Sequence, residues 1–290
     1  MGIIWGSNFI WMKWASAHIT PEQIALARVL FGLVPVLAFG LIRRDFRRWH
    51  LRYVHHYLAM ALLATSLYYV LYAAGTARLA SGIAGALSGA IPLFAFVAGA
   101  IALPDERATP QRVLGVLLGA AGVAVIARPW SADGSIDLVG VGLMLLGAAC
   151  IGVSFVYTRR FITDLGIPAT ALTTYQMGLG LIVLLLFTDV HGVGAITSDP
   201  KALGGLIVGL GLVGTGVSYV VYYFLIAEFG ATTAAASAYV PPVVALLIGW
   251  LAVGEHLNLT DGVAIALILM GIAFIRPSGR PPETGAIESA

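Results

Sequence analysis

The sequence contains little charge and a single cysteine, and both shortages narrow what the chain can be. Only 10% of its 290 residues are charged, against about 25% in soluble domains. Hydrophobic residues make up 59% of the chain, and the mean hydropathy is +0.94. Cys150 alone can form neither an internal disulfide nor a cysteine-based metal cluster. We therefore predict an all-α integral membrane protein without a sizeable soluble domain. The net charge of +2 gives no sign of a nucleic-acid partner.

The residue patterns of catalysis are also missing. The sequence has no glycine-rich phosphate loop, no HExxH motif and no Ser/His/Asp grouping at one membrane depth. The pair His55-His56 follows a basic run, which is typical of an interface rather than a metal site. We predict no enzyme activity, no cofactor and no metal. The carboxylates fall in or beside the expected loops, so the buried acid that proton- and sodium-coupled carriers usually keep is missing as well.

Apolar runs approaching the ~20 residues of a transmembrane helix recur along the chain. Ten such runs cover 2–18, 21–42, 54–76, 80–103, 111–127, 137–160, 168–188, 202–226, 231–253 and 260–275. Ala15-Ser16-Ala17 resembles a signal-peptidase site, but no basic region precedes it and Lys13 interrupts the apolar stretch. A first helix starting near Met1 is therefore the favoured interpretation.

Lys and Arg are distributed unequally among the loops, which predicts an orientation. With the N-terminus in the cytoplasm, the inside loops and tail hold Arg43, Arg44, Arg47, Arg48, Arg52, Arg107, Arg112, Arg159, Arg160, Arg276 and Arg280. The outside loops then hold only Arg78, Arg128 and Lys201. Both termini are expected in the cytoplasm, and residues 277–290, rich in Pro, Gly, Ser and Glu, are expected to form a disordered tail.

An internal repeat relates the two halves of the chain. At a constant offset of 149 residues, Ser88 corresponds to Ser237, Pro92 to Pro241, Glu106 to Glu255 and Gly122 to Gly271. Five predicted helices per copy, an odd number, would insert the second copy upside down relative to the first. We predict repeats over 1–130 and 131–276. Pro92 and Pro241 are candidate hinges, because a proline within an apolar run tends to kink a helix.

Tyrosines and neutral polar residues within the apolar runs predict a cavity, because each buried hydroxyl needs a partner or water. Tyr68 and Tyr72 share one helix face. The candidate substrate-binding residues are Asn8, Lys13, Ser66, Tyr68, Tyr72, Ser154, Tyr157, Tyr175, Gln176 and Tyr219. The tyrosines would enclose an apolar group, the amides and hydroxyls would bind an amino-acid end, and Lys13 would attract a carboxylate. For Arg28, snorkelling to the outer interface or a structural pair is favoured.

Several of these segments resemble a known family. Trp5-Gly6-Ser7-Asn8-Phe9, Leu26-Ala27-Arg28 and the repeated Pro-x13-Glu-x15-Gly pattern are similar to the drug/metabolite transporter superfamily, in particular its EamA-type branch, up to about residue 276. The Tyr68/Tyr72 pair is also similar to the YddG-type exporters of aromatic amino acids. The resemblance implies ten helices around a central cavity, cytoplasmic termini and a bacterial inner-membrane exporter of amino acids or other metabolites.

The sequence thus predicts a lipid-embedded exporter of small amphipathic metabolites, with aromatic or other hydrophobic amino acids favoured, working by alternating access. A multidrug or other metabolite exporter is the alternative within transport. A membrane-embedded enzyme lacks clustered His or acids, and a receptor or scaffold leaves the repeat unexplained. The substrate, the driving force and the oligomeric state stay open, because the glycine patterns serve packing within a monomer as well as between chains.

Overall fold

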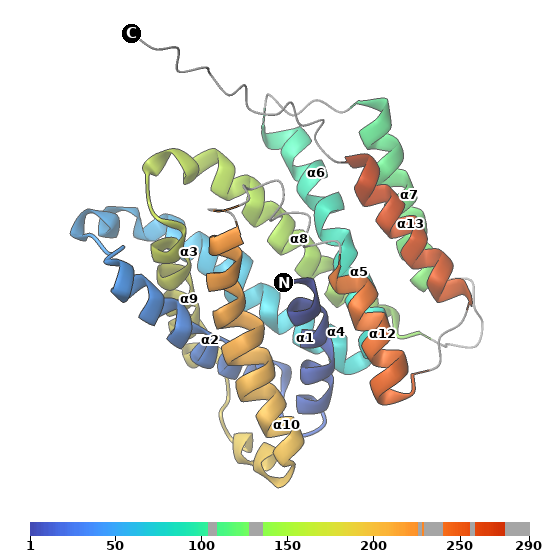
Figure 1. Ribbon diagram of the computed structural model, residues 1–290, viewed down its shortest axis with the longest axis horizontal. Coiled ribbons are helices and arrows are strands. Elements are labelled where there is room, and N and C mark those ends of the chain that lie inside the picture. Colours follow the sequence, from blue (N-terminus) through green and yellow to red (C-terminus); the bar gives the residue numbers. More distant parts are fainter. Residues whose placement is uncertain (104–108, 128–135, 226–227, 229–239, 256–258, 276–290) are drawn as a thin grey trace.

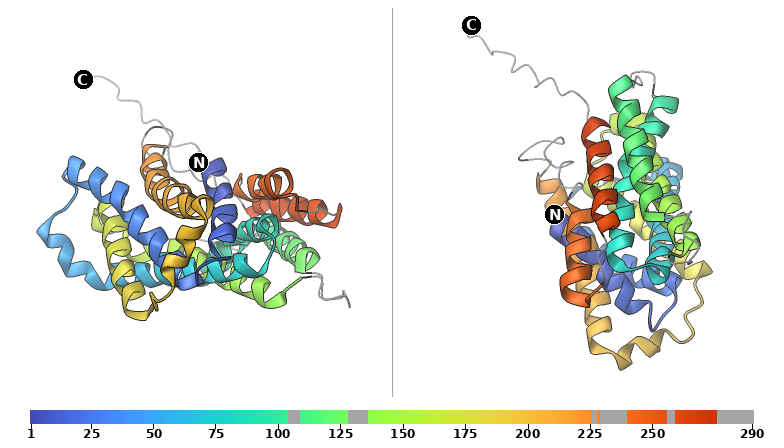
Figure 2. Two further views of the ribbon diagram at one scale, coloured as in Figure 1. Left: turned by 90° about the horizontal axis from the view of Figure 1, so that it is seen from below. Right: turned by 90° about the vertical axis from the view of Figure 1, so that its right-hand side faces the viewer.

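The computed structural model describes residues 1–103, 109–127, 136–225, 228, 240–255 and 259–275, and the secondary structure of these residues is entirely helical (Figures 1 and 2). The elements in chain order are α1 (Gly2–Ala15), α2 (Pro21–Arg43), η1 (Arg48–Tyr53), α3 (Val54–Ala61), η2 (Leu62–Ser66), α4 (Leu67–Arg78), α5 (Ser81–Leu87), η3 (Ser88–Ala90), α6 (Ile91–Ala102), α7 (Pro110–Ala127), α8 (Leu138–Phe161), η4 (Thr163–Leu165), α9 (Ala169–Phe187), η5 (Val193–Ser198), α10 (Pro200–Gly204), η6 (Gly205–Val217), α12 (Pro241–Val253) and α13 (Leu259–Ile275). Glu106, Arg107, Arg128, Ser237, Arg276, Arg280 and the tail 277–290 lie outside the described residues.

Six continuous helical stretches are long and apolar enough to cross a membrane. They are Pro21–Arg43, Arg48–Arg78, Ser81–Ala102, Leu138–Phe161, Ala169–Phe187 and Pro200–Leu225. The shorter helices α7, α12 and α13 are also apolar, and α1 precedes them all in the chain. Each of the ten apolar runs therefore contains a helix within the described part of the chain, which confirms an all-helical membrane fold.

Local sequence signals place several helix starts. Thr20 accepts a hydrogen bond from the Gln23 N–H while the Gln23 side chain accepts one from Thr20, and Pro21 follows at the first helical position of α2. Asp137 accepts a hydrogen bond from the Gly140 N–H at the start of α8. That hydrogen bond and the nearby Arg78 lower the pKa of Asp137 below its usual value. These capping residues set where α2 and α8 begin, in segments that contain few other polar side chains.

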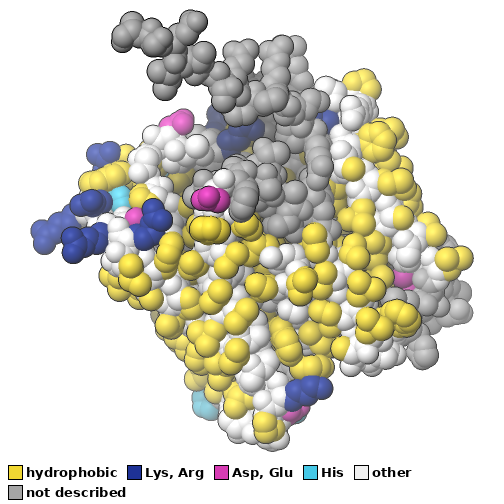
Figure 3. Space-filling model, viewed as in Figure 1, with side chains coloured by type: hydrophobic (Ala, Val, Ile, Leu, Met, Phe, Trp, Pro, Cys, Tyr) yellow, Lys and Arg dark blue, Asp and Glu magenta, His cyan; other side chains and the backbone are white. Residues whose placement is uncertain are grey.

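The flanks of the helices are apolar, as expected for contact with lipid. Exposed hydrophobic side chains include Leu30, Val34, Leu41, Ile182, Leu186, Val208, Leu247 and Leu251. On the face shown in Figure 3 hydrophobic side chains cover much of the surface, and Lys and Arg gather at the tip that joins α2 to α3. A soluble protein rarely exposes so much contiguous apolar surface.

Contacts between helix ends define two ends of the molecule. At the one we call the basic end, Thr170 donates to Asp45, His56 Nδ1 lies 2.8 Å from the hydroxyl of Tyr157, and Arg160 donates to the carbonyl of Ala102. At the opposite end, Arg78 pairs with Asp137 at 3.0 Å and His18 with Asp199 at 3.3 Å. The Ser81 N–H donates to Glu255 at 2.7 Å, also at the opposite end.

The helices of the two sequence halves pack in reciprocal pairs. Helix α7 lies along α13, side by side in Figure 1. A Cβ added at Gly122 would lie 2.6 Å from the Ala264 carbonyl oxygen, and one added at Gly271 would lie 2.5 Å from the Gly115 carbonyl oxygen. These four residues are two pairs at the same 149-residue offset, so one contact is the counterpart of the other. Glycine at both positions lets the two backbones touch.

This close approach predicts a stability difference between two glycines of α13. Gly271→Ala places a methyl group against the backbone of α7, which cannot move aside, and is expected to cost about 1–3 kcal/mol of unfolding free energy. Gly262→Ala meets nothing within 4 Å and is expected to be neutral or slightly stabilising, since alanine favours helix. Thermal unfolding of both variants in detergent measures the difference, and equal midpoints would contradict the packing.

Candidate functional site

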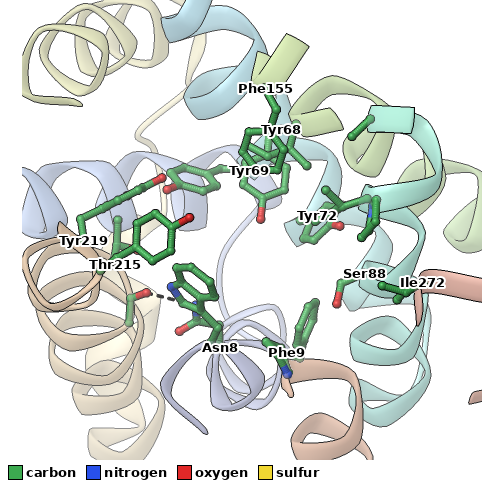
Figure 4. Close-up of a pocket in the computed structure, with 18 of the residues that line it drawn as sticks. Asn8, Phe9, Tyr68, Tyr69, Tyr72, Ser88, Phe155, Thr215, Tyr219 and Ile272 are labelled. Atoms are coloured by element: carbon green, nitrogen blue, oxygen red, sulfur yellow. Dashed lines mark hydrogen bonds between the residues drawn. The ribbon is translucent and has the colours of Figure 1, made fainter. Parts of the chain in front are cut away.

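A cavity of about 670 Å³ lies where helices from both halves meet (Figure 4). Its walls come from α1, α2, α4, α6 and α7 in the first half, and from α8, η6, residues 218–225, α12 and α13 in the second. The lining reaches the basic end at Leu103, Arg112 and Arg159. None of the described residues whose contacts join the opposite end lines it, so the described lining extends toward the basic end.

Aromatic side chains form much of the wall. The rings of Tyr68 and Tyr72 lie 4.5 Å apart between centroids, and those of Tyr68 and Tyr69 lie 4.9 Å apart. Trp5 of α1 and Tyr222 face each other at 5.6 Å. Figure 4 shows tyrosines on two sides of the open space. Such a wall offers large apolar faces with a few polar tips, which suits a partly aromatic solute.

The two groups of tyrosines follow the same sequence spacing after a threonine. Thr65 precedes Tyr69 by four residues and Tyr72 by seven, and Thr215 precedes Tyr219 and Tyr222 by the same spacings. A π-helical segment, η2 or η6, carries each threonine. π-helical turns are rare and occur frequently at functional sites.

The polar part of the wall centres on η6. Asn8 Nδ2 donates to the Gly214 carbonyl at 3.2 Å, and the Thr215 hydroxyl donates to the Leu210 carbonyl at 2.9 Å. Asn8 Oδ1 is buried and has no hydrogen-bond partner among the described residues, and neither has the Tyr72 hydroxyl. Buried polar atoms are normally satisfied, so each of these two atoms is available to a hydrogen-bond partner in the cavity.

Arg28 is a buried cation of this wall. Its side chain is only 5% exposed, its Nε donates to the Thr215 hydroxyl at 2.9 Å, and its guanidinium lies 3.9 Å from the centre of the Tyr69 ring. Snorkelling to the interface is therefore wrong for Arg28, because α4 and η6 pack against α2 and cover it. The contact with Thr215 joins the two halves of the chain.

Charge in the lining is of one sign. Arg28, Arg112 and Arg159 line the cavity, and no Asp or Glu does so among the described residues. Arg112 and Arg159 lie toward the basic end, whereas Arg28 lies deep between the helices. A cavity with this lining favours anionic groups of a solute over cationic ones.

Four of the ten candidate binding residues line the cavity. They are Asn8, Tyr68, Tyr72 and Tyr219, and the candidate hinges Pro92 and Pro241 line it as well. Pro92 and Pro241 both lie in the first turns of their helices, α6 and α12. The structure thus brings the predicted tyrosine face and the predicted amide to one place.

The other six candidates lie outside the lining and have packing partners nearby. Lys13 donates to the Ala77 carbonyl at 2.9 Å, Ser66 to the Gly180 carbonyl at 3.2 Å, and Ser154 to the Ile151 carbonyl at 2.7 Å. Tyr157 meets His56 at the basic end, and the ring of Tyr175 stacks on that of Tyr57 with centroids 4.7 Å apart. Gln176 is buried in α9.

Sequence reasoning missed Arg28, Tyr69 and Thr215 as members of one site. The signal that could have found Tyr69 and Thr215 is the repeated spacing Thr-x3-Tyr-x2-Tyr, which needs an offset of 150 residues rather than 149. No such pattern includes Arg28. Among the described residues, no group of three or more His, Cys, Asp or Glu lies close enough together to hold a metal.

A helical membrane protein with a cavity between two halves is the architecture of a transporter. The chain belongs to the EamA-like transporter family, whose model matches residues 1–128 and 138–276. It is therefore a membrane transporter of the drug/metabolite transporter superfamily.

Relatives whose names describe them as uncharacterized transporters match almost the whole chain. An uncharacterized transporter of Archaeoglobus fulgidus is 27% identical over 93% of this chain and 94% of its own. The uncharacterized transporter YdfC of Bacillus subtilis is 27% identical over 93% and 87%. The uncharacterized inner membrane transporter YedA of Escherichia coli is 27% identical over 94% and 87%. A solved crystal structure shares the fold at a TM-score of 0.58, with 20% identity and 94% of both chains covered.

Proposed function

We propose that the protein exports small amphipathic metabolites, aromatic or other hydrophobic amino acids first, by alternating access. The observation that carries this proposal is a cavity between the halves with aromatic walls, unsatisfied polar atoms and a lining that reaches the basic end. An aromatic side chain would stack on Tyr68 and Tyr72, whose pair is similar to that of the YddG-type exporters. A charged and polar head would meet the η6 side of the wall.

Alternating access needs two halves that move relative to each other, and we propose ten helices in two inverted repeats over 1–130 and 131–276. Support comes from the two matches of the family model and from the reciprocal contacts of Gly122 and Gly271. Gly6 and Gly152 also lie against backbone of another helix, although the residues of these two contacts are not related by the 149-residue offset. A Cβ at Gly6 would lie 2.9 Å from the Pro241 carbonyl oxygen, and one at Gly152 would lie 3.1 Å from that of Ile91.

The arginines of the basic end support an orientation in the membrane, and with it a direction of transport. Its arginines are Arg43, Arg44, Arg47, Arg48, Arg52, Arg112, Arg159 and Arg160, against Arg78 and Lys201 at the opposite end. By the positive-inside rule the basic end faces the cytoplasm, with both termini there. A cavity whose lining reaches the cytoplasmic end would load a metabolite from inside. The name of the E. coli relative supports a bacterial inner membrane for this chain too.

The experiment that tests the proposal is counterflow of labelled aromatic and aliphatic amino acids in liposomes holding the purified protein. Tyr68→Ala and Asn8→Ala are each expected to lower flux by roughly tenfold, because the first removes a stacking face and the second the polar partner of Gly214. Tyr53→Ala, at the basic end and outside the lining, is the control. Flux no greater than in protein-free liposomes would refute amino-acid export.

The alternative is export of drugs or other metabolites through the same cavity. The broad apolar wall and its low content of polar groups support it. Competition separates the two functions. Labelled phenylalanine and labelled drugs are each challenged with the other class, and flux of the drugs that unlabelled amino acids do not reduce would favour the alternative.

A further inference from the structure

Arg28 carries a positive charge that the described residues do not neutralise. No Asp or Glu pairs with it among the ion pairs of these residues. Its partners are the Thr215 hydroxyl, the face of the Tyr69 ring and Met12 Sδ at 4.0 Å. A guanidinium has five N–H donors, so most of them are unused here. Burying an ion without a counter-ion costs several kcal/mol, which marks such a residue as functional.

We propose that Arg28 binds the carboxylate of the transported molecule, so that this cavity selects amphipathic carboxylates and disfavours cations. The inference rests on the proposed function and names the chemistry of its substrate. The guanidinium fork fits a carboxylate through two parallel hydrogen bonds. Thr215 holds Nε and Tyr69 supports one face of the group, so the side chain is fixed before a ligand arrives. A fixed donor loses little freedom on binding.

A polar atom without a partner among the described residues, Asn8 Oδ1, belongs to a residue that contacts η6 beside the contact made by Arg28. Asn8 contacts the carbonyl of Gly214, and Arg28 contacts the side chain of the next residue, Thr215. Figure 4 shows Asn8 and Thr215 on one side of the open space and Tyr72 on the other. The free acceptor Asn8 Oδ1 suits an ammonium group. A zwitterionic α-amino acid would therefore pair its carboxylate with Arg28 and its ammonium group with Asn8 Oδ1, and its side chain would lie against the tyrosines.

The second half of the chain carries an uncharged counterpart of Arg28. A Cβ added at Gly32 would lie 2.7 Å from the Thr215 methyl group, and one added at Gly180 would lie 2.7 Å from the Thr65 methyl group. Arg28 and Gln176 each stand four residues before one of these glycines. Gln176 is 4% exposed and does not line the cavity. The helices thus accept glutamine four residues before such a glycine. Of these two positions, only the one that lines the cavity, Arg28, carries a charge.

The test uses three probes that share a phenyl group and differ in charge: 3-phenylpropionate, L-phenylalanine and phenethylamine. Binding to the purified protein is followed by tryptophan fluorescence, because Trp5 lines the cavity, and by calorimetry. The wild type is expected to bind both carboxylates about tenfold or more tighter than phenethylamine. Arg28→Gln is expected to weaken both carboxylates by about 10- to 100-fold, the worth of a charged hydrogen-bond pair.

Arg43→Gln is the matched control, since it makes the same change in α2 at an exposed position outside the lining. Arg28→Lys keeps the charge without the fork and is expected to fall between wild type and Arg28→Gln. The inference is overturned if Arg28→Gln binds the carboxylates as well as the wild type does. It is also overturned if the wild type prefers phenethylamine or binds neither carboxylate. Arg28-dependent binding without flux in liposomes would refute export alone.

Discussion

Glu255→Ala is expected to lower the thermal unfolding midpoint by roughly 5–15 °C, because it frees the start of α5 in the other half. The Glu255 carboxylate accepts hydrogen bonds from the Ser81 N–H and hydroxyl, both at 2.7 Å, and from the Gly82 N–H at 2.9 Å. Losing them leaves a buried helix N-terminus without its acceptor, at a cost of about 2–4 kcal/mol. Each kcal/mol shifts the midpoint by roughly 2–4 °C in a chain of this size.

The packing around Glu255 explains why no nearby group replaces it. Ser81 is 1% exposed, so water cannot take the place of the carboxylate. A Cβ added at Gly249 would overlap Glu255 Oε2, so glycine leaves the space that the carboxylate occupies. The contact ties the end of α12 to the start of α5 at the opposite end of the molecule.

Two variants calibrate this prediction. Glu255→Gln keeps one acceptor oxygen and is expected to lose about half as much stability as Glu255→Ala. Glu22→Ala removes an exposed acid from the first turn of α2 and is expected to shift the midpoint by less than about 2 °C. Scanning calorimetry of the three variants decides the matter, and an unchanged midpoint for Glu255→Ala would show that the contact contributes nothing.

Gly214→Ala is expected to reduce flux by at least about tenfold. An added Cβ would overlap Asn8 Oδ1 and lie 2.5 Å from the Gly209 carbonyl oxygen, so both Asn8 and the π-helical segment must shift. Asn8 and Thr215 flank this residue in the cavity wall, and a displacement of about 1 Å at such a site can cost a hundredfold in rate.

Gly204→Ala provides the comparison within the same continuous helix, because a Cβ there meets nothing within 4 Å. Its flux is expected to match the wild type. Counterflow in liposomes at equal protein content measures both variants. Equal flux from Gly214→Ala and Gly204→Ala would mean that the η6 side of the cavity does not contact the transported molecule.

The helices and the tyrosine face could be predicted because both depend on short-range patterns. Apolar runs fix where helices form, and the spacing of Tyr68 and Tyr72 places both rings on one side of a helix wherever that helix packs. The repeat offset likewise pointed to Gly122 and Gly271, which do meet the opposite half. Glu255 lies at a helix end, as its position after an apolar run indicated.

The partners of the charged residues could not be predicted, because they come from helices distant in sequence. Arg28 lies about two turns from the Thr20-Pro21 loop, which suggested the interface, but η6 contributes Thr215 from 187 residues away. Lys13 is held by a carbonyl at the end of α4, and that carbonyl has no signature in the sequence. Tyr157 and Tyr175 are the same residue type as the tyrosines of the cavity wall, but they lie against His56 and Tyr57 instead.

The π-helical segments η2 and η6 have a consequence for tolerated changes in chain length. Each π-helical turn holds about one residue more than an α-helical turn, and one residue corresponds to about 100° of rotation about the axis. Deleting one residue within Leu62–Ser66 would let that stretch become ordinary α-helix without breaking it. Because the extra residue is taken up within the π-helical turn, this deletion would keep the tyrosines of α4 facing the cavity. A one-residue deletion within the ordinary α-helix of α3 (Val54–Ala61) would instead rotate the tyrosines by about 100° relative to the start of that helix.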